Sequence, residues 1–113
     1  MSKTGLAASD QDLEQLITVF RLLADKTRLN ILLLLSSGER NVTSLCESLG
    51  LPQPTVSHHL GLLRMNNLIG NRRNGKQIFY SLNGRIDEAN KMALQIATEN
   101  YEVGIFDKAV QTV

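Results

Sequence analysis

Apolar residues recur at helical spacing near the start of the chain. They stand on one face of a predicted helix, at Leu13, Leu16, Ile17, Phe20 and Leu23. This periodicity is typical of an amphipathic helix. Ser9 precedes the run, and Asp12 lies three positions after Ser9, which is the spacing of a capping box. We therefore predict that the first helix begins directly after Ser9.

The second predicted helix is apolar on nearly every side. Asp25 caps it, Gly38 ends it, and the residues from Leu29 to Leu35 leave almost no polar face. A helix without a polar face is buried on several sides, so we expect this helix at the centre of the fold.

A tight turn joins two short helices in the middle of the chain. The third helix is predicted to begin near Val42 and to stop at Gly50, which suits a left-handed cap. Pro52 and Pro54 fit the turn and the first helical positions of a fourth helix, which ends near Asn67.

The fourth helix separates into an apolar face and a polar, uncharged face. At about 100° per residue, the apolar face collects Val56, Leu60 and Leu63, with His59 at its edge. The opposite side carries Pro54, Ser57, His58, Gly61 and Met65, with Thr55 on the flank. A helix in the major groove of DNA needs such a face, whereas a core helix does not. The pattern predicts a helix-turn-helix whose contacts to bases or phosphates come from Gln53, Thr55, Ser57 and His58.

A β-hairpin is predicted around Asn74-Gly75, the usual sequence of a type I′ turn. Ile78, Tyr80 and Leu82 alternate after the turn, as a strand with one packed face should. The polar residues near the tip that we expect to contact phosphates or the neighbouring minor groove are Arg72, Arg73, Lys76 and Gln77.

A last long helix is predicted from about Arg85 to Val103, capped by Asn83, with one face formed by Ile86, Ala89, Ala93 and Ile96. The fold class is then mostly α with a two-stranded β-wing: a winged helix-turn-helix with four helices, the hairpin and a fifth helix. Residues 1–8 are predicted to be disordered, residues 9–104 to form the domain, and residues 105–113 to be a C-terminal tail.

Charge is distributed unevenly along a chain that is nearly neutral overall. The 113 residues are 42% apolar, enough for one modest core, and carry a net charge of +1. No acidic residue stands between Glu47 and Asp87, where the cations are Arg64, Arg72, Arg73, Lys76 and Arg85. This asymmetry indicates a phosphate-binding face that includes Arg64; the alternative is a solvated surface with its acids elsewhere by chance.

Several classes of protein are disfavoured. A single cysteine forms no internal disulfide, which suits a reducing cytosol. No apolar run is long enough to span a membrane, so we expect a soluble cytoplasmic protein. Clustered carboxylates, a nucleophile–base pair and a phosphate loop are all lacking, so we expect neither an enzyme nor a cofactor.

The segments LADKTRLNILLLL, VTSLCESLGLPQPTVSHHLGLLRMNNLI and RRNGKQIFYSL resemble the ArsR/SmtB family of winged-helix repressors. The resemblance covers about Phe20 to Leu82, and its specific signals are Asp25-Lys26-Thr27-Arg28-Leu29 and Ser57-His58-His59-Leu60. It implies a homodimer built largely from the first and last helices, which binds an inverted repeat in double-stranded DNA. It also implies DNA contacts at Gln53, Ser57 and His58. Pro52 stands where relatives often have a Ser or Thr cap, so the start of the recognition helix is expected to differ.

Many members of that family release DNA on binding a metal, but this chain lacks their ligand patterns. Asn41 and Thr43 occupy the positions of a Cys-Val-Cys pattern at the third helix. On the last helix only Asp87 is kept, and the later ligand positions fall on Asn100 and Val103. We predict no metal site of either kind; one formed across the dimer by other carboxylates stays an alternative.

The only cysteine and histidines are Cys46, His58 and His59. Cys46 lies where two helices of such a unit cross closely, so we interpret it as a packing residue. His58 is interpreted as a DNA contact and His59 as a half-buried packing residue. The main hypothesis is therefore a DNA-binding repressor. The alternatives are a redox-responsive repressor that acts through Cys46 and a winged helix that serves protein–protein assembly.

Overall fold

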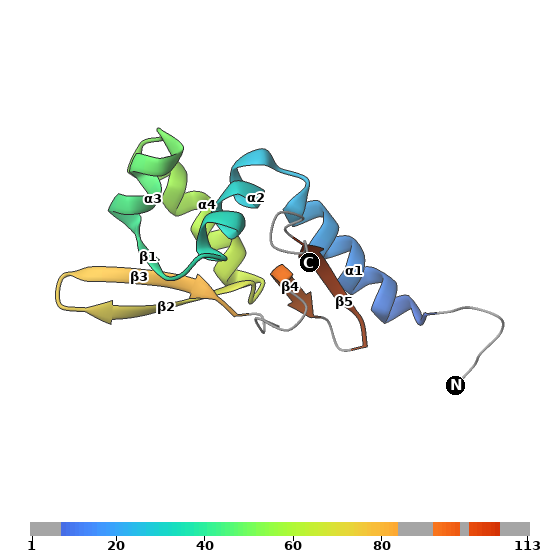
Figure 1. Ribbon diagram of the computed structural model, residues 1–113. Helices are drawn as coiled ribbons and strands as arrows, with labels where there is room; N and C mark the ends of the chain where they lie inside the picture. Colours follow the sequence, from blue (N-terminus) through green and yellow to red (C-terminus); the bar gives the residue numbers. More distant parts are fainter. Residues whose placement is uncertain (1–7, 84–91, 98–99, 107–113) are drawn as a thin grey trace, which may run out of the picture.

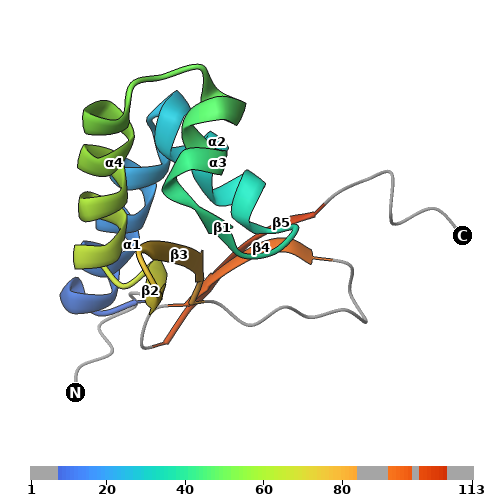
Figure 2. The same ribbon diagram turned by 90° about the vertical axis from the view of Figure 1, so that its left-hand side faces the viewer.

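The computed structural model describes residues 8–83, 92–97 and 100–106. These residues form four helices and five strands: α1 (Asp10–Leu23), α2 (Lys26–Leu35), β1 (Arg40–Asn41), α3 (Val42–Leu49), α4 (Gln53–Met65), β2 (Ile69–Asn74), β3 (Gln77–Leu82), β4 (Met92–Ala97) and β5 (Glu102–Phe106). Helices α2, α3 and α4 stand above the sheet of β1, β3 and β2, and α1 extends away from the wing (Figures 1 and 2). The winged helix-turn-helix fold predicted from the sequence is confirmed.

The first two helices begin at their predicted caps. Ser9 Oγ accepts the backbone N–H of Asp12 at 3.1 Å, and Asp12 Oδ2 accepts the N–H of Ser9 at 3.3 Å, which completes the capping box. Asp25 Oδ1 accepts the N–H of Arg28 at 2.9 Å. Helix α2 ends with Ser36 as its C-cap, slightly earlier than the predicted end at Gly38.

The turn between α3 and α4 is built as the sequence predicts. Asn41 caps α3 by accepting the N–H of Ser44 at 2.8 Å. Gly50 adopts a left-handed conformation with φ 66°, and its N–H donates to the carbonyl of Cys46 at 2.8 Å. A residue with a Cβ is strained at this φ, so glycine allows the chain to leave α3 and enter α4 within a few residues.

The wing contains one strand more than predicted, and its turn lies one residue later. The strand order is β1-β3-β2, because β1 pairs with β3 beside the hairpin. Asn74 pairs with Gln77, so the two-residue loop is Gly75-Lys76. Among the described residues of this turn only Gly75 has a positive φ. A type I′ turn needs positive φ at both loop positions and a type II′ turn only at the first, so the predicted type I′ turn at Asn74-Gly75 is wrong.

The predicted last helix is replaced, over its described residues, by an antiparallel pair of strands, β4 and β5. Residues 84–91 and 98–99 of that prediction lie outside the described residues. From Tyr101 to Ile105, half-buried and exposed residues alternate strictly, and Val103 and Ile105 are β-branched. Ala93 and Ile96 also fit a helical period, so the sequence alone does not distinguish a helix from strands here. Strand β5 includes Ile105 and Phe106, which were predicted to belong to the tail.

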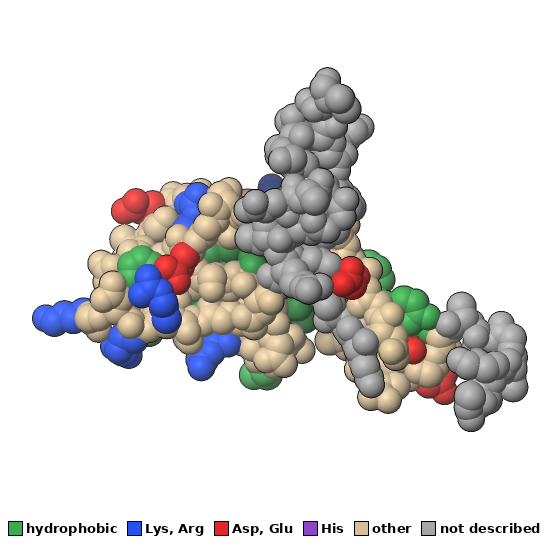
Figure 3. Space-filling model, turned by 60° about the horizontal axis from the view of Figure 1, so that its bottom comes forward, with side chains coloured by type: hydrophobic (Ala, Val, Ile, Leu, Met, Phe, Trp, Pro, Cys, Tyr) green, Lys and Arg blue, Asp and Glu red, His purple; other side chains and the backbone are tan. Residues whose placement is uncertain are grey.

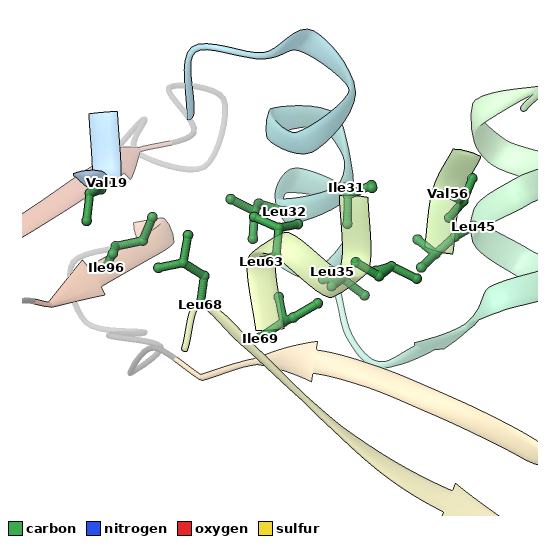
Figure 4. Packing of buried hydrophobic residues seen from close by; sticks show 11 residues of the cluster. Val19, Ile31, Leu32, Leu35, Leu45, Val56, Leu63, Leu68, Ile69 and Ile96 are labelled. Carbon is green, nitrogen blue, oxygen red and sulfur yellow. The ribbon is translucent and has the colours of Figure 1, made fainter. Parts of the chain in front are cut away.

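One hydrophobic cluster connects the four helices with β2, β3, β4 and β5. It runs from Val19 and Ile96 at one end to Leu45 and Val56 at the other (Figure 4). The fully buried side chains that lie between these ends are Ile31, Leu32, Leu63 and Ile69. The amide of Asn100 donates to Asp12 Oδ1 at 2.8 Å, which fastens the β4–β5 turn to the start of α1. No helix in the described parts of the chain is long and apolar enough to cross a membrane.

Candidate nucleic-acid interface

Helix α4 packs one face against the core and exposes the other to solvent. Val56, Leu60 and Leu63 are 0%, 1% and 0% exposed, as predicted from their place on the apolar face of the helix. The residues proposed to contact DNA from this helix are all exposed: Gln53, Thr55, Ser57, His58 and Arg64. Gly61 and Met65 are exposed on the same helix. The helical periodicity of the sequence therefore distinguishes the residues that anchor α4 from those that remain exposed to a ligand.

The start of α4 has no side-chain cap. Pro52 occupies the N-cap position, and its carbonyl accepts the N–H groups of Thr55 at 3.1 Å and Val56 at 3.2 Å. Pro54 stands in the first turn and lacks an N–H, so it leaves no donor unpaired there. Gln53 is exposed beside this uncapped end.

His59 is half-buried, as the sequence predicts, and is bound to a cation. Its Nδ1 lies 3.4 Å from an Nη of Arg28 on α2. The ring centroids of His58 and His59 are 5.5 Å apart in an edge-on arrangement, yet the two side chains have different surroundings because His58 is exposed.

The three cations of the wing are not equivalent. Arg73 and Lys76 are exposed, and their side chains have no hydrogen-bond or ion-pair partner among the described residues. Arg72 binds Glu39 through two hydrogen bonds, Nε to Oε2 at 2.8 Å and Nη to Oε1 at 2.7 Å. These hydrogen bonds lower the pKa of the Glu39 carboxyl and raise the pKa of Arg72. The side chain predicted to contact phosphate is thus already paired with a carboxylate.

Gln77 is also engaged within the protein. Its Oε1 accepts a hydrogen bond at 3.3 Å from the amide of Asn41, the residue that caps α3. Sequence reasoning missed Glu39 and Asn41 because it did not predict β1, which brings Asn41 opposite Phe79 of β3. The acid Glu39, which stands directly before β1 in the sequence, offered no local signal of a partner on β2.

The exposed face of α4 and the base of the wing border one open hollow of about 590 Å³. Gly61, Arg64 and Met65 line it from α4, and Gly70 and Asn71 line it from β2. Lys and Arg side chains gather over the wing end of the molecule, with acidic side chains among them (Figure 3). Of the predicted contact residues only Arg64 lines this hollow, which lies between α4 and the base of the wing.

Cys46 is half-buried and packs against the hydrophobic cluster. Within the described ranges, no group of three or more His, Cys, Asp or Glu residues could hold a metal ion. Asn41, which stands at one of the thiolate positions of metal-binding relatives, uses its carboxamide to cap α3.

Comparison with known proteins identifies the family. Residues 25–70 match the model described as bacterial regulatory protein, arsR family. The chain is 48% identical over 66 residues to the HTH-type transcriptional regulator KmtR of Mycobacterium tuberculosis, a match that covers 58% of this chain and 51% of KmtR. It is 41% identical over 73 residues to the arsenical resistance operon repressor of Staphylococcus aureus, with 65% of this chain and 70% of the repressor covered.

A solved structure with the same fold is the homodimeric winged helix-turn-helix DNA-binding domain of a possible ArsR-family transcriptional regulator from Mycobacterium bovis. Its TM-score is 0.61 at 34% identity, over 69% of this chain and 75% of that chain. This chain spans only about half the length of KmtR, 51%. These matches, together with the geometry of α3, α4 and the wing, show that the chain belongs to the ArsR family of bacterial regulatory proteins.

Proposed function

We propose that the protein is a transcription regulator of the repressor type, which acts in the cytoplasm as a homodimer on an inverted-repeat operator. One observation carries the proposal: α4 buries Val56, Leu60 and Leu63 and exposes a polar face, uncharged except for Arg64, on its other side. A helix anchored in this way can enter the major groove without rearranging the core. The named relatives described above are themselves transcriptional regulators or repressors.

In this proposal the N-terminal half of α4 reads the base edges. Gln53, Thr55, Ser57 and His58 are exposed and carry donors or acceptors that match the major-groove edges of base pairs. The proposed phosphate contacts come from Arg64 on α4 and from the unpaired wing cations Arg73 and Lys76.

Self-association would use the apolar stripe of α1. Leu13, Ile17 and Phe20 are 43%, 45% and 54% exposed and lie at helical spacing on one face. Such a stripe on a helix is typical of an interface with a partner. The M. bovis relative is described as homodimeric. We propose that a second copy covers the stripe, with the β4–β5 pair beside it in place of the predicted last helix. The two recognition helices of the dimer would then reach half-sites about one turn of DNA, roughly 34–36 Å, apart.

The proposed regulator does not sense metals through cysteine or histidine, because its only such residues are Cys46, His58 and His59. Cys46 is half-buried against the core, and the chain offers it no second cysteine for a disulfide. We therefore propose that Cys46 packs the crossing of α3 and α4 and is not a redox sensor.

A gel-shift titration at several salt concentrations tests the proposal. The probe is the DNA upstream of the protein's own gene, and random duplex of equal length is the competitor. We expect specific binding that weakens steeply with salt and is lost when Ser57→Ala is combined with His58→Ala. The matched control is Ser37→Ala, an exposed position after α2 that should bind normally. Equal affinity for both duplexes would contradict an operator function and would favour the protein–protein alternative.

A further inference from the structure

Arg72 and Glu39 form an ion pair, called the brace below, that crosses one face of the wing sheet. Arg72 stands on β2, an outer strand, and Glu39 directly precedes β1 on the other side of the sheet. The guanidinium of Arg72 lies over the ring of Phe79 on the middle strand, 4.9 Å from its centroid. From there it binds both carboxylate oxygens of Glu39, at 2.7 and 2.8 Å. The two side chains together therefore span the width of the three-stranded sheet.

Arg72 and its neighbour Arg73 point to opposite faces, because side chains alternate along a strand. Arg72 pairs across the hairpin with Phe79, and Arg73 pairs with Ile78. Only Arg72 has a carboxylate within reach: within the described segments the Arg73 side chain has no ion-pair partner. The two arginines have the same charge and adjacent positions, yet only Arg73 is free to meet a phosphate.

We propose that Arg72 is a positioning residue of the wing, that it stays on Glu39 when DNA binds, and that the phosphate contacts of the wing come from Arg73 and Lys76. This inference rests on the proposed DNA-binding function. If Arg72 turned to a phosphate, it would lose two charge-assisted hydrogen bonds and leave the Glu39 carboxylate unneutralised near the DNA backbone. The attraction gained at Arg72 would then be offset by the repulsion from Glu39.

The salt dependence of DNA binding separates a positioning role from a phosphate contact. Each neutralised phosphate adds about 0.9 to the slope of log K against log salt for duplex DNA. Arg73→Gln should lower that slope by about 0.9. The double variant Glu39→Gln with Arg72→Gln removes both charges of the brace and should keep the wild-type slope, while its affinity falls by less than about tenfold because the wing is less well oriented. A slope lowered as much as in Arg73→Gln would overturn the proposal.

Exchanging the two charges adds a second, independent readout. Arg72→Glu alone should weaken binding strongly, because two carboxylates then face each other and the DNA. Adding Glu39→Arg restores an opposite-charge pair across the same sheet and should recover most of the lost affinity, since the brace is rebuilt with its charges reversed. If Arg72 contacted a phosphate directly, the exchange would leave the affinity as low as in the single variant, and the proposal would be wrong.

The same titrations distinguish a failure of the proposed DNA-binding function from a failure of the positioning role of Arg72. Wild-type protein that shows no salt-dependent binding to duplex DNA contradicts the proposed function before any variant is tested. Wild-type protein that binds with a steep slope, combined with a lowered slope in the Glu39→Gln, Arg72→Gln variant, contradicts only the positioning role. Near-ultraviolet circular dichroism and thermal unfolding of each variant establish that the fold is intact, which we expect because the ion pair is exposed and adds little stability.

Discussion

Arg28 of α2 donates a hydrogen bond to Nδ1 of His59 on α4 across 3.4 Å. The same guanidinium donates through Nε to the carbonyl of Leu22 near the end of α1, at 3.0 Å. Because an arginine has no acceptor, the imidazole must accept in this contact and carry its proton on Nε2. One cation, with a side chain only 16% exposed, therefore fastens the recognition helix to both N-terminal helices.

Replacing His59 should lower the stability of the protein, whereas replacing His58 should abolish specific DNA binding and leave the stability unchanged. His59→Leu removes the acceptor for Arg28 and should lower the free energy of unfolding by about 1 kcal/mol. For a domain of this size, that lowers the melting temperature by about 4–8 °C. His58→Leu changes an exposed ring and should leave the melting temperature unchanged while it abolishes specific DNA binding. Differential scanning calorimetry and gel shifts of both variants check this expectation, and equal melting temperatures for the two variants would argue against the Arg28–His59 bond.

Asp25 should make stability depend on pH in the acid range. The carboxylate accepts the backbone N–H of Arg28, and this hydrogen bond, aided by the charge of Arg28, lowers the pKa of Asp25 below its ordinary value of 3.8. A group whose pKa is lower in the folded state stabilises the fold above its unfolded pKa, and that contribution disappears as the pH falls through the folded pKa. Asp25→Ala should therefore cost about 1 kcal/mol near neutral pH and progressively less below pH 3.8.

Urea unfolding at pH 7 and at pH 3 measures this difference. Asp25→Asn is the matched control, because asparagine caps a helix well but carries no charge. We expect it to stay close to wild type at pH 7 and to keep its cap at pH 3, where wild type loses part of the contribution of the Asp25 carboxylate. A cost of Asp25→Ala that does not change with pH would mean that the ionised carboxylate is not what caps α2.

The helix-turn-helix could be predicted from the sequence because its signals are local. Gly50 marks the end of α3, and the spacing of Val56, Leu60 and Leu63 orients α4 without knowledge of any other element. The strands β4 and β5 could not be predicted in this way. Their sequences fit both a helical and an alternating period, and packing against Val19 and the rest of the core accompanies the extended form.

The ion pair of Arg72 and Glu39 in the wing also could not be predicted from local sequence signals. Arg72 and Glu39 are 33 positions apart in the sequence, and their contact depends on the register of β1 against β3. The sequence placed Arg72 near the tip of the predicted hairpin, but it did not identify Glu39 as the partner of Arg72. A charge count alone therefore does not show which cations of this wing are already paired with a carboxylate.

Charges placed in the α1 stripe should separate the dimer without unfolding the protein. Ile17 and Phe20 are 45% and 54% exposed, so Ile17→Glu combined with Phe20→Glu costs little in the isolated chain. In a dimer that buries this stripe, the carboxylates would raise the dissociation constant roughly a hundredfold or more. Sedimentation equilibrium measures the change, and Thr18→Lys, an exposed neighbour outside the stripe, serves as the control. A variant that remains a dimer would show that α1 is not the interface.

Cys46 should be replaceable without loss of function. It is half-buried against the hydrophobic cluster, so Cys46→Ala leaves only a small gap and should lower the free energy of unfolding by about 1 kcal/mol. DNA affinity should remain at the wild-type value in both reducing and oxidising buffer, and zinc, copper or arsenite at stoichiometric levels should not change it. An oxidant that weakens binding of the wild type but not of Cys46→Ala would establish redox sensing instead.

We expect Gly61 to lower the stability of α4 and to allow DNA to approach the helix closely. A Cβ at this position of α4 would meet nothing within 4 Å, and glycine inside a helix costs roughly 0.8–1 kcal/mol relative to alanine. Gly61→Ala should therefore raise the melting temperature. Gly61 lies one helical turn after Ser57 and His58 on the exposed side of α4, so its new methyl group would project toward the groove and weaken operator binding. Gly70→Ala is the contrasting variant: its Cβ would lie 2.8 Å from Oδ1 of Asn83, so the Asn83 side chain must shift and its hydrogen bond to the carbonyl of Asn67 is disturbed; the melting temperature should not rise as it does in Gly61→Ala. If Gly61→Ala is stabilised and still binds the operator as tightly as wild type, the DNA does not approach α4 at this turn.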